Sequence, residues 1–535
     1  MKYYAWENYF MINQIKKIGT ALEKLGDKVL LIIAFVIFWG LTYYSLRYTE
    51  ILKPDTEIPM TIPDNALINL LIFMGIMILF FLLRTILLRK CNLDSDKLCR
   101  RFMGVITVLV GVFSVGWVAL CHVVPRADGA SLCLVAQLML EGADFGFMDP
   151  PGYMSYNPHQ FSLLSVIHLL FTLFGDYQAF QYMNALCMPL LFYSGYKLVQ
   201  LICSKWEPVL YYTALFISCL PLFFYVPYVY GEITSTTFTL VLMWQVVRYC
   251  KTGKKTSFLW GTLAIVFACI MRMNSLIVLV AAGIILLLHA LRNAKWQATA
   301  WLAAMTIAVF AADAGIQAYY ENLSDKEILD GIPYISYVLM GLEDKEQGPG
   351  WFNGTNYTQL IAHNYDTELT AADNTIAVKE RLKVFWNDKS YGIDFFRRKI
   401  LSQWNSPAYH SLYETGSFDC EKEELPSIVQ QIYYDRESLV NGFMNRYQFV
   451  LYLCTSIMAT FALFHKKRED SEETTLENHI LIIAIVGGFL FSALWEAMSR
   501  YVISYVVYMI PLAAIGMWQL QQGLNCIWSR LSTQK

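Results

Sequence analysis

Long apolar runs recur along the whole chain and constrain its fold more than any other feature of the sequence. A run of about 20 apolar residues can cross the roughly 30 Å hydrocarbon core of a bilayer as a helix. Every backbone polar group in that core must be paired within the protein, so such a chain folds as a helical bundle. The apolar runs cover residues 29–46, 67–89, 102–123, 161–175, 178–203, 207–228, 233–250, 257–271, 274–291, 296–318, 445–465, 478–495 and 501–521. The sequence therefore predicts an all-α polytopic membrane bundle of about 12–13 transmembrane helices.

The composition agrees with a membrane protein and excludes two other classes. Of 535 residues, 56% are hydrophobic and only 16% are charged. A soluble protein carries about 25% charged residues, so a cytosolic enzyme is excluded. The 41 basic and 43 acidic residues nearly cancel. Since a nucleic-acid-binding protein needs a basic surface, no nucleic-acid partner is predicted.

Lysine and arginine concentrate in the cytoplasmic loops of membrane proteins, and here they predict that both chain ends are cytoplasmic. The basic clusters are Lys16, Lys17, Lys24, Lys28, Arg89, Lys90, Lys97, Arg100, Arg101, Lys251, Lys254, Lys255, Lys466, Lys467, Arg468, Arg530 and Lys535. Two cytoplasmic ends require an even number of crossings, so one of the thirteen runs is not a simple span. The weakest is 161–175, about 22 Å long as a helix. Either it is shallow or re-entrant, or the 178–203 run contains a second turn.

This topology divides the chain into three parts. Residues 1–320 are predicted as a transmembrane region with an outer loop at 122–160, and residues 445–535 as C-terminal transmembrane helices. Between them, residues 321–444 are predicted as a mixed extracytoplasmic domain, since they are rich in Asp, Asn, Tyr and Trp.

Two local features are predicted within the 321–444 segment. A helix is expected over 371–386, with Val378, Leu382 and Phe385 on one face. N-x-S/T triplets begin at Asn322, Asn353 and Asn356, which matter only if the host glycosylates its outer face.

The first candidate cluster of functional residues follows the third apolar run. Arg126 and Asp128 precede Gly129 and an amphipathic helix that is predicted over 130–140 on the outer surface. Ionisable residues at a membrane boundary are functional candidates, because burying their charge is costly. A carboxylate at this junction can face a cavity and act as a general base. The alternative is that Asp128 caps the N-terminus of the 130–140 helix.

The second cluster closes the same loop. Tyr156, Asn157, His159 and Gln160 stand directly before the apolar run that begins at Phe161. These side chains offer hydrogen-bond donors and acceptors at the outer interface. The alternative is the polar start of a helix at the membrane surface.

Two further clusters lie at outer helix boundaries. Glu232 opens the 233–250 run, and Arg272 and Asn274 interrupt the apolar stretch 257–291. A Glu and an Arg in hydrophobic surroundings need partners or a water-filled cavity, and a purely structural ion pair is the alternative.

The last cluster opens the final apolar run. Glu496 and Arg500 are spaced four residues apart, which suits an ion pair within one helix. Arg500 can equally bind a lipid phosphate, because a guanidinium matches phosphate oxygens bidentately. Under the predicted topology all of these charges face the same side of the membrane.

The order of these elements resembles the GT-C glycosyltransferase superfamily. The resemblance covers an acidic first outer loop, a short surface helix, the Tyr156-Asn-Pro-His159-Gln160 helix entry, Tyr-Gly-Glu232, Arg272-Met-Asn274 and Trp-Glu496-x-x-x-Arg500. It is closest to bacterial relatives of the protein O-mannosyltransferases and of the lipid A aminoarabinose transferase, over roughly residues 100–290 and 480–520. The chain departs from the mannosyltransferases, which carry an Asp-Glu pair where Gly129 follows Asp128.

The resemblance implies a polytopic enzyme of the cell membrane that uses a polyprenyl-phosphate sugar donor. The sugar passes, with inversion, to a lipid, glycan or protein acceptor on the outer face, with Asp128 as the general base. The implied donor- and phosphate-binding residues are Arg126, His159, Gln160, Arg272 and Arg500. The implied supporting residues are Tyr156, Asn157, Glu232, Asn274 and Glu496. Some members use a divalent cation and others do not, and no ligand set stands out here.

Two other functions stay open at the level of the sequence. A transporter of lipid-linked sugars also places charges along a path through a bundle, but it is expected to show paired helix breaks in two matching halves. A polysaccharide polymerase or ligase shares the lipid-phosphate chemistry and has its main outer loop late in the chain, as the 321–444 segment is.

Overall fold

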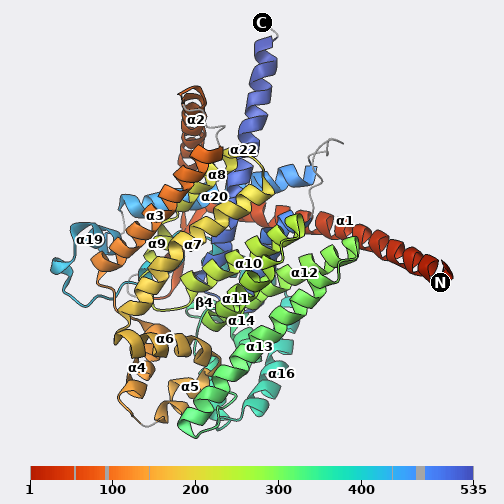
Figure 1. Ribbon diagram of the computed structural model, residues 1–535. Coiled ribbons are helices and arrows are strands. Elements are labelled where there is room, and N and C mark those ends of the chain that lie inside the picture. The colour runs from red at the N-terminus through yellow and green to blue at the C-terminus, as the bar shows by residue number, and fades with distance from the viewer. Residues whose placement is uncertain are drawn as a thin grey trace.

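A computed structural model of the chain describes residues 2–53, 56–90, 96–143, 145–435, 438–464 and 476–533 (Figure 1). It is 79% helical with almost no sheet, so the predicted all-α bundle is confirmed. Among the described residues, eight helices are long and apolar enough to cross a membrane. The basic residues Lys466, Lys467, Arg468 and Lys535, used to orient the chain, lie outside the described residues.

The first third of the chain holds three long helices, a β-hairpin, and the shorter helices between Ala127 and Phe174. In order these are α1 (Lys2–Arg47), β1 (Tyr48–Leu52), β2 (Pro59–Pro63), α2 (Ala66–Lys90), α3 (Asp96–Cys121), α4 (Ala127–Leu140), η1 (Gly146–Met148), α5 (Tyr153–Tyr156), η2 (Pro158–Gln160) and α6 (Phe161–Phe174). Strands β1 and β2 pair antiparallel, with Tyr48 opposite Pro63. The surface helix predicted over 130–140 is present as α4 and begins three residues earlier.

The middle of the chain contributes most of the core. Its elements are α7 (Gln178–Ile202), α8 (Glu207–Ile217), α9 (Leu220–Phe224), α10 (Glu232–Thr252), α11 (Thr256–Met271), η3 (Met273–Ser275), α12 (Leu276–Asn293) and α13 (Gln297–Ser324). Helix α10 carries Ser, Thr and Gln among its apolar residues and is buried over most of its length. It is enclosed by other helices and does not need a lipid-facing apolar surface.

The expected 12–13 spans exceed the eight long apolar helices because several apolar runs fold differently. The 207–228 run breaks after Ile217 into α8 and the five-residue α9, where Pro221 stands at the start of the second helix. Helices α6 and α11 have 14 and 16 residues, short of the roughly 20 needed for a full crossing. The 178–203 run is one continuous helix, so it contains no second turn.

The C-terminal helices pack at the centre of the bundle. They are α20 (Leu439–Phe464), η5 (Leu476–His479), α21 (Ile480–Leu494), η6 (Ser499–Val502) and α22 (Ile503–Thr533). Helix α22 packs along α20 and also meets α8 and α10, while α1 leaves the bundle towards the N-terminus (Figure 1).

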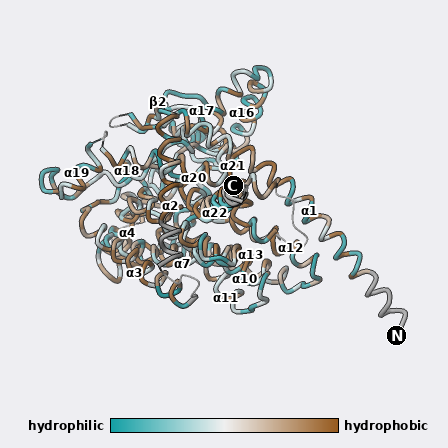
Figure 2. The backbone as a smooth tube through the Cα atoms, turned by 90° about the horizontal axis from the view of Figure 1, so that it is seen from above, coloured by the Kyte–Doolittle hydropathy of each residue, from teal (hydrophilic) through white to brown (hydrophobic). Residues whose placement is uncertain are grey.

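The segment between α13 and α20 is built from short helices. They are α14 (Tyr334–Leu342), β3 (Asp344–Lys345), β4 (Gly348–Pro349), α15 (Thr355–Ala362), α16 (Thr367–Asn387), α17 (Lys389–Trp404), α18 (Ser411–Glu414), η4 (Lys422–Glu424) and α19 (Ser427–Tyr434). Its two strands have two residues each, so its regular secondary structure is helical and not of mixed type. Hydrophilic positions gather at α16 and α19, whereas α20 is mostly hydrophobic (Figure 2).

The predicted helix over 371–386 lies within α16, but its buried face differs from the expected one. Leu382 is 48% exposed, whereas Thr370 and Asn374 are buried. Asn374 donates a hydrogen bond to Ser336 of α14 at 2.7 Å, so a polar contact fixes the helix face where an apolar one was expected.

The segment is clamped to the loop between α21 and η6. The side chain of Lys399 is buried, donates to the carbonyl of Trp495 at 2.7 Å and also donates to that of Gly341. Burial lowers the pKa of Lys399 to about 7. The backbone N–H of Ala497 donates to the carbonyl of Gly350 at 2.7 Å. Residues 495–498 are therefore positioned by a segment about one hundred residues earlier in the chain.

The close packing of α22 on α20 depends on one glycine. A Cβ at Gly516 would overlap the carbonyl oxygen of Cys454, which is backbone and cannot rotate away. We expect Gly516→Ala to lower the free energy of unfolding in detergent by about 1–3 kcal/mol. Gly315→Ala in α13 is the control, because nothing lies within 4 Å of a Cβ there. Equal melting temperatures for the two variants would contradict this account of the packing.

Candidate functional site

One cavity of about 690 Å³ gathers most of the residues that the sequence singled out. Its wall has contributions from the 122–160 loop, η3, α12, α13, α14, α15 and the α21–η6 loop. The predicted residues that line it are Asp128, Asn157, His159, Gln160, Arg272, Asn274, Glu496 and Arg500. Arg126, Tyr156 and Glu232 are not in its lining.

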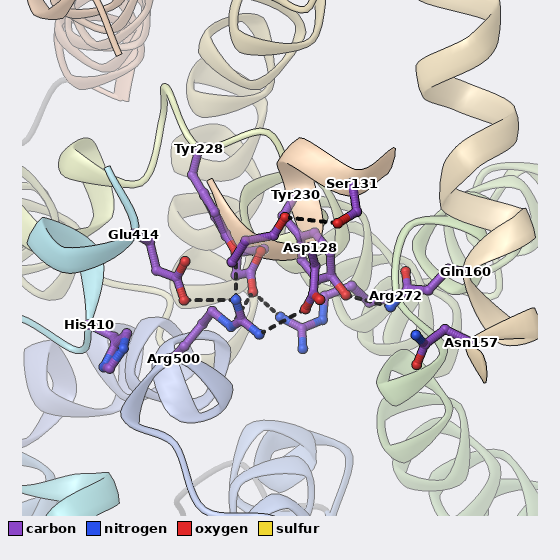
Figure 3. Close-up of polar contacts among 12 residues, drawn as sticks. Asp128, Ser131, Asn157, Gln160, Tyr228, Tyr230, Arg272, His410, Glu414 and Arg500 are labelled. Carbon is purple, nitrogen blue, oxygen red and sulfur yellow. Dashed lines mark hydrogen bonds and ion pairs between the residues drawn. The ribbon is translucent and has the colours of Figure 1, made fainter. Parts of the chain in front are cut away.

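The guanidinium of Arg500 stands at the centre of the charged groups (Figure 3). Its Nη1 lies 2.7 Å from Glu414 Oε1 and donates to the hydroxyl of Tyr228 at 2.5 Å. Its Nε lies 3.6 Å from Glu232 Oε1, and its Nη2 lies 3.7 Å from Asp128 Oδ2. The side chain is only 5% exposed. An arginine this deeply buried needs such partners, because an unpaired charge there is very costly.

Arg272 forms the second cationic group of the cavity. It pairs with Glu232, whose side chain is 2% exposed, so the structural ion pair considered from the sequence is present. The guanidinium also lies 5.5 Å from the ring centre of Tyr230 and 5.6 Å from that of Tyr501. Arg272 lines the cavity while it is paired with Glu232, so a ligand can reach its guanidinium.

A glycine allows this pair to form. A Cβ at Gly231 would overlap the carbonyl of Met271, so only glycine lets the turn before α10 approach the end of α11 this closely. The approach places Glu232, the first residue of α10, beside Arg272, the C-cap of α11. The glycine of the Tyr-Gly-Glu element is therefore required by the close approach of the start of α10 to the end of α11.

Asp128 lies in the first turn of α4, not at its N-cap, so the interpretation of this residue as a cap is wrong. The N-cap is Arg126, and no side chain caps the helix. With its side chain 38% exposed, Asp128 is an accessible carboxylate of the cavity. A negative charge in the first turn of a helix is also favoured by the helix dipole.

The residues around Asp128 explain two features of the loop. A Cβ at Gly129 would lie 2.6 Å from the carbonyl oxygen of Val229, which accounts for glycine at this position. Arg126 turns away from the cavity: its Nη1 donates to the carbonyl of Tyr413 at 2.8 Å, and its guanidinium lies 3.8 Å from that ring centre. The structure therefore places Arg126 outside the group of residues that could contact a ligand.

The polar residues before α6 form another part of the cavity wall. Gln160 Nε2 donates to the hydroxyl of Tyr230 at 2.5 Å, and His159 lines the cavity beside it. Asn157 donates to the hydroxyl of Tyr357 at 3.1 Å and accepts from that of Tyr337 at 3.4 Å. Tyr156 is buried behind this wall, with its hydroxyl 3.2 Å from that of Tyr365.

Glu496 does not form the expected i,i+4 pair. Residues 495–498 are not helical, and the ion pairs of Arg500 within the described chain are with Asp128, Glu232 and Glu414. Glu496 lies between the two flanking membrane-spanning segments and is 6% exposed. Burial raises its pKa to about 7, against the lowering effect of Arg500.

Several residues of the site were missed from the sequence. Glu414 belongs to a polar segment in which nothing distinguishes it from other acidic residues. Glu57, on the cavity wall, lies 3.6 Å from the buried ring of His410, and that contact lowers the pKa of Glu57. Asp313 is a carboxylate inside the 296–318 run, and its position in an apolar span was a signal that could have been used.

The side chains of the cavity do not form a ligand set for a bound divalent cation. Among the described residues, no three His, Cys, Asp or Glu side chains lie close enough together to hold a metal ion. Two carboxylates of the cavity, Asp128 and Glu414, instead pair with Arg500.

Comparison with known proteins gives no family. No protein-family model matches the chain, and no curated protein matches it. The resemblance to the GT-C superfamily therefore depends on the residues of the chain itself.

The raised pKa of Glu496 predicts how stability depends on pH. The pKa is about 7 in the folded protein and 4.5 as the reference value, so stability decreases as pH rises from about 4.5 to 7. We expect Glu496→Gln, which stays neutral, to exceed the wild type in free energy of unfolding by about 3 kcal/mol above pH 7. The difference should vanish below pH 4.5.

Thermal unfolding of the detergent-solubilised protein across this pH range measures the effect. The control is Glu346→Gln, at an exposed glutamate outside the cavity. A stability difference between Glu496→Gln and the wild type that does not change with pH would contradict the burial of a titrating carboxylate.

Proposed function

We propose that the protein is a membrane glycosyltransferase that moves a sugar from a polyprenyl-phosphate-linked donor to an acceptor on the outer face of the membrane. The observation that carries this proposal is the make-up of one cavity. An accessible carboxylate, Asp128, faces two guanidiniums, Arg272 and Arg500, and the same cavity continues onto apolar side chains of membrane-spanning helices.

The guanidiniums suit the phosphate of such a donor. Arginine binds phosphate oxygens bidentately and keeps its charge at all working pH values. Arg272 and Arg500 line the cavity. Arg272 is paired with Glu232, and Arg500 is paired with Glu414. These carboxylates hold both cations in place before a ligand arrives, which lowers the reorganisation needed on binding.

The apolar wall suits the isoprenoid chain. It is formed by Leu276 and Ile277 of α12, Phe310 of α13 and Phe491 of α21. All four lie in helices long and apolar enough to cross a membrane. A donor with its phosphate at the arginines can therefore extend its chain along side chains that favour hydrocarbon over water.

The reaction follows from these positions. The acceptor hydroxyl oxygen attacks the anomeric carbon of the sugar, and the carbon–oxygen bond to the phosphate breaks. The hydroxyl proton passes to Asp128, and the bonding electrons leave with the polyprenyl phosphate. Attack opposite the leaving group inverts the anomeric centre. The negative charge that grows on the phosphate is stabilised by Arg272 and Arg500.

The remaining predicted residues act by positioning. His159, Gln160 and Asn274 line the cavity and offer hydrogen bonds to sugar hydroxyls or phosphate oxygens. Glu232 holds Arg272 and contacts Arg500, so its role is to orient the cations. Arg126, which turns towards Tyr413, has no donor-binding role in this proposal.

Donor turnover tests the role of Asp128. We expect Asp128→Asn to lower the release of polyprenyl phosphate from labelled polyprenyl-phosphate sugars about 100-fold or more, because general base catalysis contributes about that much. The assay uses membranes that contain the protein. The control is Asp330→Asn, at an exposed aspartate outside the cavity, which should leave turnover unchanged.

Three other outcomes of this assay would each contradict part of the proposed function. Full turnover in Asp128→Asn would remove Asp128 as the base. No turnover of any such donor, together with movement of the intact lipid-linked sugar across the membrane, would identify a transporter. Donor consumption that lengthens a polymer would identify a polymerase or ligase.

The proposal includes an orientation. Both termini are cytoplasmic, and residues 321–444 are extracytoplasmic. In a variant without the twelve native cysteines, Glu380→Cys on the exposed surface of α16 should react with an impermeant maleimide in intact cells. Lys254→Cys, between α10 and α11, should react only after permeabilisation. The opposite pattern would place the cavity on the cytoplasmic side.

A further inference from the structure

One part of the cavity wall is made of amide and tyrosine side chains. Asn157 joins the hydroxyls of Tyr357 and Tyr337 at 3.1 and 3.4 Å, and all three residues line the cavity. Figure 3 shows Asn157 on the Gln160 side of the group, away from Glu414. Since Tyr337 lies in α14 and Tyr357 in α15, the 321–444 segment supplies part of this wall.

Asn356 adds an unsatisfied polar atom to the same wall. The residue is 1% exposed and lines the cavity, and its Oδ1 has no hydrogen-bond partner within the described chain. A buried polar atom without a partner is costly, so this oxygen favours a ligand that donates a hydrogen bond. Its burial also makes Asn356 unsuitable for glycosylation in the folded protein, although it begins an N-x-T triplet.

Tyr357 of this wall lies within electrostatic range of two carboxyl groups of the cavity, Asp128 and Glu496. Burial raises the pKa of Tyr357, and the nearby carboxylates of Asp128 and Glu496 raise it further. A ligand held by Asn157, Asn356 and Tyr357 therefore lies in the same cavity as Asp128, which an acceptor hydroxyl has to reach.

The charge of the cavity restricts the ligand further. Its lining holds five carboxyl groups, Glu57, Asp128, Asp313, Glu414 and the partly ionised Glu496, against the two guanidiniums of Arg272 and Arg500. A bound donor phosphate adds another negative charge. An acceptor that carries phosphate or carboxylate groups would be repelled, because like charges at close range are unfavourable.

We propose that Asn157, Asn356, Tyr337 and Tyr357 form an acceptor subsite for an uncharged saccharide. Amide groups both donate and accept hydrogen bonds, which matches neighbouring sugar hydroxyls, and tyrosine offers a hydroxyl and an apolar ring face in one side chain. The role of this saccharide as an acceptor rests on the proposed glycosyl transfer. Its binding at this subsite does not depend on that function.

Binding to the full-length protein in nanodiscs of uncharged lipid, without a donor, tests the subsite. The probes are neutral trisaccharides of glucose, mannose or N-acetylglucosamine, followed by saturation-transfer NMR. We expect saturable binding of at least one trisaccharide and about tenfold weaker binding in Tyr357→Phe, which removes one hydroxyl. Asn356→Ala should weaken binding to a similar degree. Tyr434→Phe, at an exposed tyrosine outside the cavity, is the control and should bind as the wild type does.

Three results would overturn the subsite. No trisaccharide binds, or one binds equally well to the wild type, Tyr357→Phe and Asn356→Ala. Alternatively, phosphatidylglycerol vesicles or a Ser/Thr-rich peptide bind in a way that depends on Tyr357.

The experiment also separates the two proposals. Saccharide binding that depends on Tyr357, in a protein that turns over no polyprenyl-phosphate sugar, supports the subsite and rejects the transferase. Turnover with a peptide or lipid as the acceptor supports the transferase and rejects the subsite.

Discussion

The buried guanidinium of Arg500 joins parts of the chain that are far apart in sequence. Glu414 approaches it from the segment between α13 and α20, Tyr228 from the turn between α9 and α10, Glu232 from the start of α10, and Asp128 from α4. Removing one partner of a buried ion pair costs about 3–5 kcal/mol, because the other charge stays buried without compensation. The relative placement of these segments therefore depends on Arg500 and its partners.

The same arrangement makes the site possible. The cavity needs contributions from the 122–160 loop, the ends of long apolar helices and the late helical segment, and none of these forms it alone. Lys399 and Gly350 hold the loop of Trp495 and Ala497, so the position of Arg500 is set from outside the bundle as well as from within. In our account the late segment both positions the phosphate-binding cations and forms the saccharide wall.

Apolar runs and charged helix ends were sufficient to predict the helical bundle, and most of the residues that they singled out line the cavity. They were not sufficient for contacts between distant segments. Glu414 lies in a polar region where its sequence neighbours give no sign of a buried partner. The spacing of Glu496 and Arg500 predicted a pair within a helix, but residues 495–498 are not helical because the late segment binds their backbone. Asp128 looked like a cap because the chain after it is helical, and the helix in fact begins one residue before it.

The central claim is that one cavity holds the donor phosphate between two arginines and the sugar beside Asp128. A cryo-EM map of the Asp128→Asn protein in nanodiscs with a polyprenyl-phosphate sugar tests it most directly. We expect phosphate density in contact with Arg272 and Arg500, the isoprenoid chain along Ile277 and Phe310, and the sugar next to residue 128. Density for the lipid-linked sugar at another place, with this cavity empty, would contradict the account.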